Sequence, residues 1–265
     1  MPRPASSSAS EGKNRMDILG PAIIFFAAAG ASAFGTLIGG ASLITIPTLI
    51  ILGLPPHMAI GTDRFGVIGI GTAGLYAFHR KRMIDYRLSF MMAVPTFLGA
   101  IVGANLVLAI SENLLRIIIV LTNVLCLAYL LLNPKIGLEQ KSPSASRLRY
   151  VFGGVSCFII GIYGGFYGAM AATFLAYVLI MGFGQTFIQT AANIKVASVC
   201  FTSSAAIVFV LNGSVDFPLG LAMFCGCLCG SYLGAHFSDK IGNLWIKRFF
   251  VAVLTIMIVK MAISL

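Results

Sequence analysis

Long apolar runs follow one another along almost the whole chain, and two of them are too long to be one membrane span. They cover Ile18 to Leu52 and Leu148 to Met181. At about 1.5 Å per residue, one straight helix over either run would be about 50 Å long, whereas the hydrocarbon core of a bilayer is about 30 Å thick. Glycines interrupt both runs near the middle. Each run is therefore expected to form a hairpin of two half-helices that meet near the midplane, or one long broken helix.

The composition places these runs in a membrane. Of the 265 residues, 58% are hydrophobic and 10% are charged, and a soluble domain of this length does not need so much apolar surface. The runs show no long alternation with a period of two residues, so the spans are expected to be helices and not barrel strands. The fold class that follows is an all-α polytopic membrane protein whose surface contacts the lipid bilayer.

The net charge of +10 does not indicate a nucleic-acid partner, because the basic residues lie in the connections between apolar runs. They are Arg80, Lys81, Arg82, Arg87, Lys135, Lys141, Arg147 and Arg149. Such a distribution is typical of loops on the inner face of a membrane.

An internal repeat organises the chain. At an offset of 131 residues, Ile84-Asp85-Tyr86 matches Val215-Asp216-Phe217, and Arg116 matches Lys247 (247 − 116 = 131). We expect a disordered tail at 1–16, a first transmembrane repeat at 17–133, a polar linker at 134–147 and a second repeat at 148–265. Each repeat would hold one glycine-broken hairpin and three transmembrane helices.

The basic loops favour one topology over another. If the long runs enter the membrane and return, the repeats are inverted, and the loops at 80–87, 135–149 and 240–248 share one face. If the long runs are single crossings, the repeats are parallel with four spans each, and Lys240, Lys247 and Arg248 fall on the opposite face. The inverted arrangement is the prediction, and the parallel one stays open.

The same offset superposes two cations, Arg64 and Lys195 (195 − 64 = 131). Counted along their helices, they lie about 10 and about 15 Å into the membrane. A bare charge at such depth costs at least about 2.5–3.5 kcal/mol, so both should face protein, water or a counter-ion. We expect them to meet at the repeat interface near the ends of the broken helices and to bind an anion there.

Neighbouring residues complete the predicted anion site. Thr62, Gln189, Thr190 and Asn193 can donate hydrogen bonds to an oxyanion, and Gly39, Gly40 and Gly168 lie at the breaks. A structural reading stays open, in which Arg64 pairs with Asp63 or extends to the surface and Lys195 is structural. Asp63 has three candidate roles: a site for a coupling proton, a counter-charge, or a residue in the first turn of a helix.

Other motifs indicate no cofactor, metal or catalytic centre. Gly69 to Gly74 reads "GIGTAG" but lies inside an apolar helix, where glycines serve close packing. Cys225, Cys227 and Cys229 form C-x-C-x-C, which lacks the spacing of a zinc site and is typical of small packing residues. With no P-loop, HExxH or GxSxG motif in the sequence, the protein is not expected to be an enzyme.

Two stretches carry a resemblance to a known family. "GGASLITIPTLIILGLPPHMAIGTDRF" and "GGFYGAMAATF", together with the duplication, resemble the TauE/SafE family of sulfite and organosulfonate exporters and related sulfonate permeases. One subgroup of that family similarly carries a basic residue and a lysine at positions that match Arg64 and Lys195. The chain departs from that subgroup at Ala169, Met170 and Ala172, where "FYGPGTGTF" has Pro and Gly, so the second hairpin should be less open to a ligand.

The resemblance implies a multi-pass carrier in the bacterial inner membrane that exports a small sulfur oxyanion, with the anion bound near the midplane between the repeats. Two other functions stay open: a channel-like anion pore, and a permease that takes up another small organic anion with protons. A homodimer also stays open.

Overall fold

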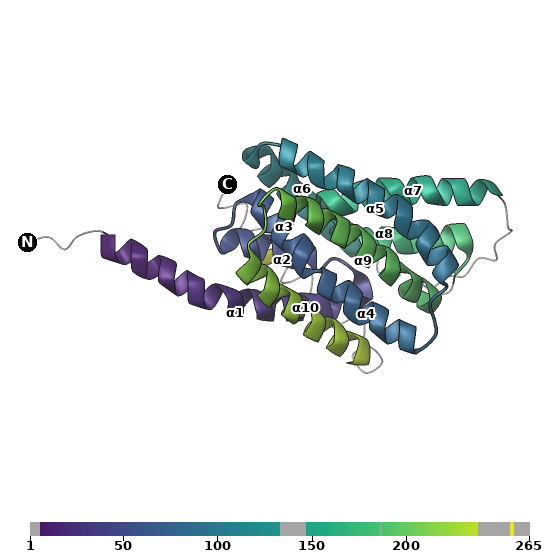
Figure 1. The fold of residues 1–265 in the computed structure, drawn as a ribbon, viewed down its shortest axis with the longest axis horizontal. Coiled ribbons are helices and arrows are strands. Elements are labelled where there is room, and N and C mark those ends of the chain that lie inside the picture. The colour runs from purple at the N-terminus through teal and green to yellow at the C-terminus, as the bar shows by residue number, and fades with distance from the viewer. Residues whose placement is uncertain (1–5, 133–146, 186, 238–254, 257–265) are drawn as a thin grey trace, which may run out of the picture.

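The computed structural model describes residues 6–132, 147–185, 187–237 and 255–256, and the described residues form helices joined by short connections. Three of these helices are long and apolar enough to cross a membrane, over Tyr86–Ala109, Gln189–Leu211 and Phe217–Gly234. The helices lie side by side with their axes roughly along one direction (Figure 1). The predicted all-α fold class is confirmed for the described residues.

The first long apolar run contains two helices, α1 (Ser6–Ile38) and α2 (Ser42–Ile51). Between them the chain turns at Gly39 and Gly40, whose φ angles of 78° and 90° lie in the left-handed region that glycine adopts without strain. The turn is tight, because a Cβ atom on Gly35 would lie 2.9 Å from the Cβ of Ala41. We call residues 39–42 the first hairpin tip.

The second long run is built in the same way from α7 (Arg147–Phe166), α8 (Ala171–Tyr177) and a π-helical turn at Val178–Gly182. Here the chain turns through Gly168, at φ 69°, and Met170, at φ 62°. Met170 is a non-glycine residue in the left-handed region, and its side chain is buried in the core. We call residues 167–170 the second hairpin tip.

A broken helix follows the first hairpin: α3 (Pro56–Gly66) and α4 (Ile68–Arg80) meet at Val67. Because only residues 52–55 connect α2 to α3, these two helices run in opposite directions. Glycines in α4 lie against neighbouring helices, as the packing interpretation of "GIGTAG" predicts. A Cβ atom on Gly69, Gly71 or Gly74 would lie within 2.7 Å of Phe224, Val199 or Lys195.

The remaining described helices are α5 (Tyr86–Ala109), α6 (Glu112–Leu132), α9 (Phe187–Leu211) and α10 (Phe217–Phe237). Glycine contacts pair α10 with α1 and α5 with α7. Cβ atoms on Gly226, Gly230 and Gly234 would lie 2.0–2.4 Å from the carbonyl oxygens of Phe25, Ala29 and Ala33. Those on Gly99 and Gly103 would lie 2.2 and 2.0 Å from the carbonyl oxygens of Phe158 and Ile162. In each pair, residue numbers at the contacts increase in the same direction along both helices, so the two helices are parallel.

Similar contacts give the directions of α3, α4, α9 and α10 relative to α1. Helices α3, α4 and α10 run with α1, because Gly61 lies against Ser214 and Gly69 against Cys227. In contrast, α9 runs against α3 and α4, since Gly71 lies against Val199 and Gly61 against Phe209. Helix α2 therefore runs opposite to α1, so the first long run folds as a hairpin (Figure 1).

One predicted boundary differs from the structure, and others lie outside the described residues. Helix α1 begins at Ser6, so residues 6–16 are helical where a disordered tail was expected. Extending an existing apolar helix costs less than starting one, which accounts for the longer helix. The predicted linker lies almost wholly within 133–146, and the last predicted span lies largely within 238–254 and 257–265, all outside the described residues.

Candidate functional site

A buried ion pair occupies the end of α3. The side chains of Asp63 and Arg64 are 0% and 1% exposed, and Arg64 Nη2 lies 2.5 Å from Asp63 Oδ2. Both residues come from one helical turn of α3, which lies beside α2, α9 and α10. A charge pair at such depth is tolerated only when further hydrogen bonds satisfy its donors and acceptors.

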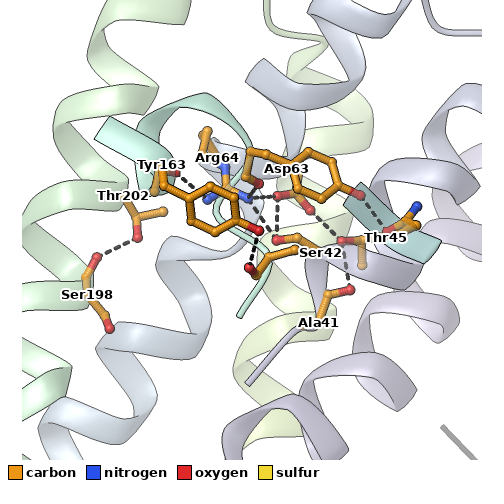
Figure 2. Close-up of polar contacts among 12 residues, drawn as sticks. Ala41, Ser42, Thr45, Asp63, Arg64, Tyr163, Ser198 and Thr202 are labelled. Carbon is orange, nitrogen blue, oxygen red and sulfur yellow. Dashed lines mark hydrogen bonds and ion pairs between the residues drawn. The ribbon is translucent and has the colours of Figure 1, made fainter. Parts of the chain in front are cut away.

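Residues at and just after the first hairpin tip provide some of these hydrogen bonds. Ser42 Oγ donates to Asp63 Oδ2 at 2.8 Å, and Thr45 Oγ1 donates to Asp63 Oδ1. Ser42 Oγ also accepts from Arg64 Nη2 at 2.8 Å. Because Ser42 and Thr45 are three residues apart on α2, both hydroxyls face α3 from the same side. Figure 2 shows them on one side of the ion pair.

The second hairpin tip meets the other side of the guanidinium. Arg64 Nη1 donates to the carbonyl oxygen of Gly164 and Nη2 to that of Tyr167, both at 3.0 Å. A Cβ atom on Gly168 would lie 1.9 Å from Arg64 Nη1, so this position admits no side chain while Arg64 holds its place. The ion pair therefore contacts both tips.

Lys195 has different surroundings. Its side chain is 8% exposed, yet it makes no hydrogen bond or ion pair with any residue that the structure describes. The methylene groups cross α4 at Gly74, where a Cβ atom would lie 2.7 Å from both Cδ and Cε of Lys195. Gly74 is ten residues beyond Arg64 (74 − 64 = 10), or about 15 Å along the helix axis. The structure thus does not bring the two cations together.

The residues matched at the offset of 131, Thr62 and Asn193, accept hydrogen bonds from the backbone. Thr62 Oγ1 accepts from the N–H of Asp216 at 2.9 Å, and Asn193 Oδ1 accepts from the N–H of Asp85 at 2.8 Å. Each contact fixes the connection that leads into α10 or α5. Asn193 Nδ2 donates to Gln185 Oε1 at 2.9 Å. Both side chains were predicted as donors to an anion, and both hold loops in this structure.

Comparison with known proteins identifies the family. The model of the family "Sulfite exporter TauE/SafE" matches residues 24–261, which is most of the chain. The chain belongs to the TauE/SafE family.

Curated relatives of this TauE/SafE protein are named as transporters. It is 30% identical over 242 residues to the "Probable membrane transporter protein" of Haemophilus influenzae, covering 91% of this chain and 93% of the relative. It is 29% identical to the "Probable membrane transporter protein YfcA" of Escherichia coli, covering 90% and 88%. No solved structure matches significantly. The protein is a membrane transporter of this family.

The other predicted residues of the TauE/SafE protein fall into two groups. The first group is the glycines of the hairpin tips, Gly39, Gly40 and Gly168. Gly168 lies against Arg64, and a Cβ atom on Gly39 would lie 2.6 Å from Thr173 Oγ1 in the second hairpin. Thr190 is buried near the start of α9, and its hydroxyl has no hydrogen-bond partner among the described residues. Gln189 lies exposed on the same turn.

Several polar residues of the centre were missed from the sequence. Ser42 and Thr45 carry a usable signal, since they are three residues apart in an otherwise apolar helix. Tyr167 donates from its hydroxyl to Asn123 Oδ1 on α6 at 2.7 Å, and Tyr163 donates to the carbonyl oxygen of Ala169 at 2.7 Å. Tyr167 and Asn123 are 44 residues apart in sequence, Tyr163 and Ala169 are six apart, and the offset of 131 relates neither pair.

Proposed function

We propose that this TauE/SafE transporter exports a small sulfur oxyanion, such as sulfite or an organosulfonate, across the bacterial inner membrane. The observation that carries the proposal is Lys195, whose side chain is only 8% exposed and has no counter-ion among the described residues. Placing a charged side chain in the apolar interior of a membrane costs at least about 2.5–3.5 kcal/mol. A bound oxyanion would offset that cost by supplying both the negative charge and the acceptors.

The helix arrangement supports a carrier with two inverted repeats. The segment 56–80, which contains α3 and α4, matches α9 at 187–211 at the offset of 131 (187 − 56 = 131). The starts of α5 and α10, at Tyr86 and Phe217, match at the same offset. Because α9 runs against α3 and α4, matched segments have opposite directions in the membrane. Inverted repeats of this kind provide alternating access in many secondary transporters.

The membrane potential supports export. With the cytoplasm negative, each negative charge that leaves the cell gains about 2.3 kcal/mol per 100 mV. A monovalent or divalent sulfur oxyanion can therefore leave without a coupling ion. Asp63, the candidate proton carrier, is already held by Arg64, Ser42 and Thr45, an arrangement that suits a fixed counter-charge.

Currents in proteoliposomes test the proposal. Sulfite, sulfoacetate, taurine, sulfate and chloride would each be added rapidly to the wild type, to Lys195→Gln and to Lys81→Gln, a control that removes an exposed cation at the end of α4. We expect a saturable current with a sulfur oxyanion that is lost in Lys195→Gln and kept in Lys81→Gln.

Three results would contradict the proposal. A current that never saturates would indicate a channel-like pore. Absence of current together with acidification of the lumen during uptake would indicate a proton-coupled permease. An unchanged sulfite current in Lys195→Gln would return this residue to a structural role.

A further inference from the structure

The buried ion pair on α3 is the place where the two hairpins are joined. Asp63 and Ser42 connect α3 to the first tip, and Arg64 connects α3 to the second tip at the carbonyl of Tyr167 and to the end of α7 at that of Gly164. The tips come from segments more than a hundred residues apart in sequence, and both contact the adjacent residues Asp63 and Arg64. Figure 2 shows Ser42 beside this ion pair.

The hydrogen-bond inventory of Arg64 argues against its use as a substrate ligand. Its Nη2 atom lies within bonding distance of three protein oxygens, and Nη1 donates to a fourth. Nε has no partner among the described residues, and it is buried. An anion that recognised the planar fork of an arginine would need the two Nη groups, which are already occupied by the protein.

The second tip is also held by contacts with α6 and α7. Tyr167 accepts from Arg64 at its backbone carbonyl, while its hydroxyl donates to Asn123 on α6. Tyr163, one turn earlier in α7, donates to the carbonyl oxygen of Ala169. The tip therefore has few free backbone groups, and a change at Arg64 would release its remaining attachment to α3.

We propose that Asp63 and Arg64 are positioning residues that clamp the two hairpin tips together, and that they act on transport through the tips instead of binding the anion. We call this arrangement the tip clamp, consisting of Asp63, Arg64, Ser42, Thr45 and the carbonyls of Gly164 and Tyr167. This inference rests on the proposed function only in its transport measurements, because the labelling measurements do not require a transported anion.

Thiol labelling tests the tip clamp without requiring transport. In a cysteine-free background, Thr173→Cys places a thiol beside Gly39, where the hairpins meet. The rate of modification by a small thiol reagent would be measured in proteoliposomes with Arg64 intact, with Arg64→Gln and with Lys195→Gln. The last variant is the matched control, because it also replaces a buried cation by glutamine.

We expect Arg64→Gln to raise the labelling rate about tenfold or more, since removing one partner leaves a buried charge uncompensated and separates the tips. Lys195→Gln should leave the rate unchanged. In transport, Arg64→Gln should lower the maximal rate with little change in KM, whereas Lys195→Gln should raise KM.

The inference is overturned if Arg64→Gln labels at the wild-type rate, or if it raises KM as Lys195→Gln does. Should Arg64→Gln fail to insert, Arg64→Lys and Ser42→Ala take its place, because each removes only some of the contacts. Their labelling rates should fall between those of the wild type and a fully open tip, and wild-type rates in both would also overturn the clamp. A failure to find any transported anion would leave the labelling result standing.

A double-variant comparison provides a second test. Asp63→Asn combined with Arg64→Gln removes both partners of one clamp and leaves no uncompensated charge, so its increase in labelling rate should be smaller than the sum of the two single increases. Additive increases in labelling would show that the two side chains act independently, which contradicts the clamp.

Discussion

Two buried cations in this protein have opposite electrostatic surroundings. Arg64 is surrounded by a carboxylate, a hydroxyl and two carbonyl oxygens, so its charge is compensated within the protein. Lys195 has no such partner among the described residues, although its side chain is only 8% exposed. A transporter that binds an anion reversibly needs a cation without a counter-ion, as Lys195 is here. A cation that is already paired within the protein attracts an anion only weakly.

The contrast predicts different effects of sulfite on thermal stability. Since ligand that binds only the folded state stabilises it, sulfite at 100 times its Kd should add about 2.7 kcal/mol to the wild type. Lys195→Gln should lose that increase while keeping or gaining stability in the absence of sulfite, because an unpaired buried charge is removed. Melting temperatures in detergent, with and without sulfite, provide the measurement. An equal sulfite response in both proteins would contradict the assignment of Lys195.

The hairpin tips depend on backbone conformations that only certain residues adopt easily. Gly168 has a φ of 69°, and any side chain there would collide with Arg64. Gly30, in contrast, is a helical glycine with open space around its Cβ position. The two glycines therefore make a matched pair for substitution.

Gly168→Ala should lower both stability and transport, whereas Gly30→Ala should leave both near wild type. A strained left-handed residue costs about 1–3 kcal/mol, and the displaced Arg64 adds to that. Melting temperature and sulfite flux measured in parallel check this prediction. Wild-type behaviour of Gly168→Ala would mean that the second tip relaxes away from Arg64.

The sequence predicted the helical class, the glycine breaks and the two cations, because each is carried by composition, spacing or an internal match. It also predicted that the two cations meet, whereas the structure does not bring them together. Equal positions in two antiparallel segments lie at equal distances from opposite ends, so a match at the offset of 131 separates Arg64 from Lys195 instead of joining them. The partners of Asp63 and Tyr167 were missed because tertiary contacts between distant segments determine them.

In the whole molecule, two polar connections lie at opposite ends of the helix bundle. The connection after α4 carries Lys81 and Arg82, and the connection between α9 and α10 carries Asn212 and Gly213. Since α9 runs against α4, these connections are about one membrane thickness apart. The positive charge of the first connection predicts that it faces the cytoplasm.

This orientation predicts one-sided labelling in intact cells. In a cysteine-free background, a membrane-impermeant maleimide should label Asn212→Cys from outside and should label Lys81→Cys only after the cells are opened. Both positions are exposed, so access to the reagent depends on the side of the membrane. Labelling of both positions from the same side would contradict the helix directions.

The pairing of α1 with α10 has a consequence for synthesis. A Cβ atom on Gly20 would lie 3.3 Å from Leu219, so α1 packs against a helix that emerges from the ribosome 199 residues later (219 − 20 = 199). At about 5–20 residues per second, α1 waits on the order of ten seconds or longer for its partner. During that time lipid or the insertion machinery must cover the surface that the glycines of α10 will later occupy, so this closely packed helix pair forms late.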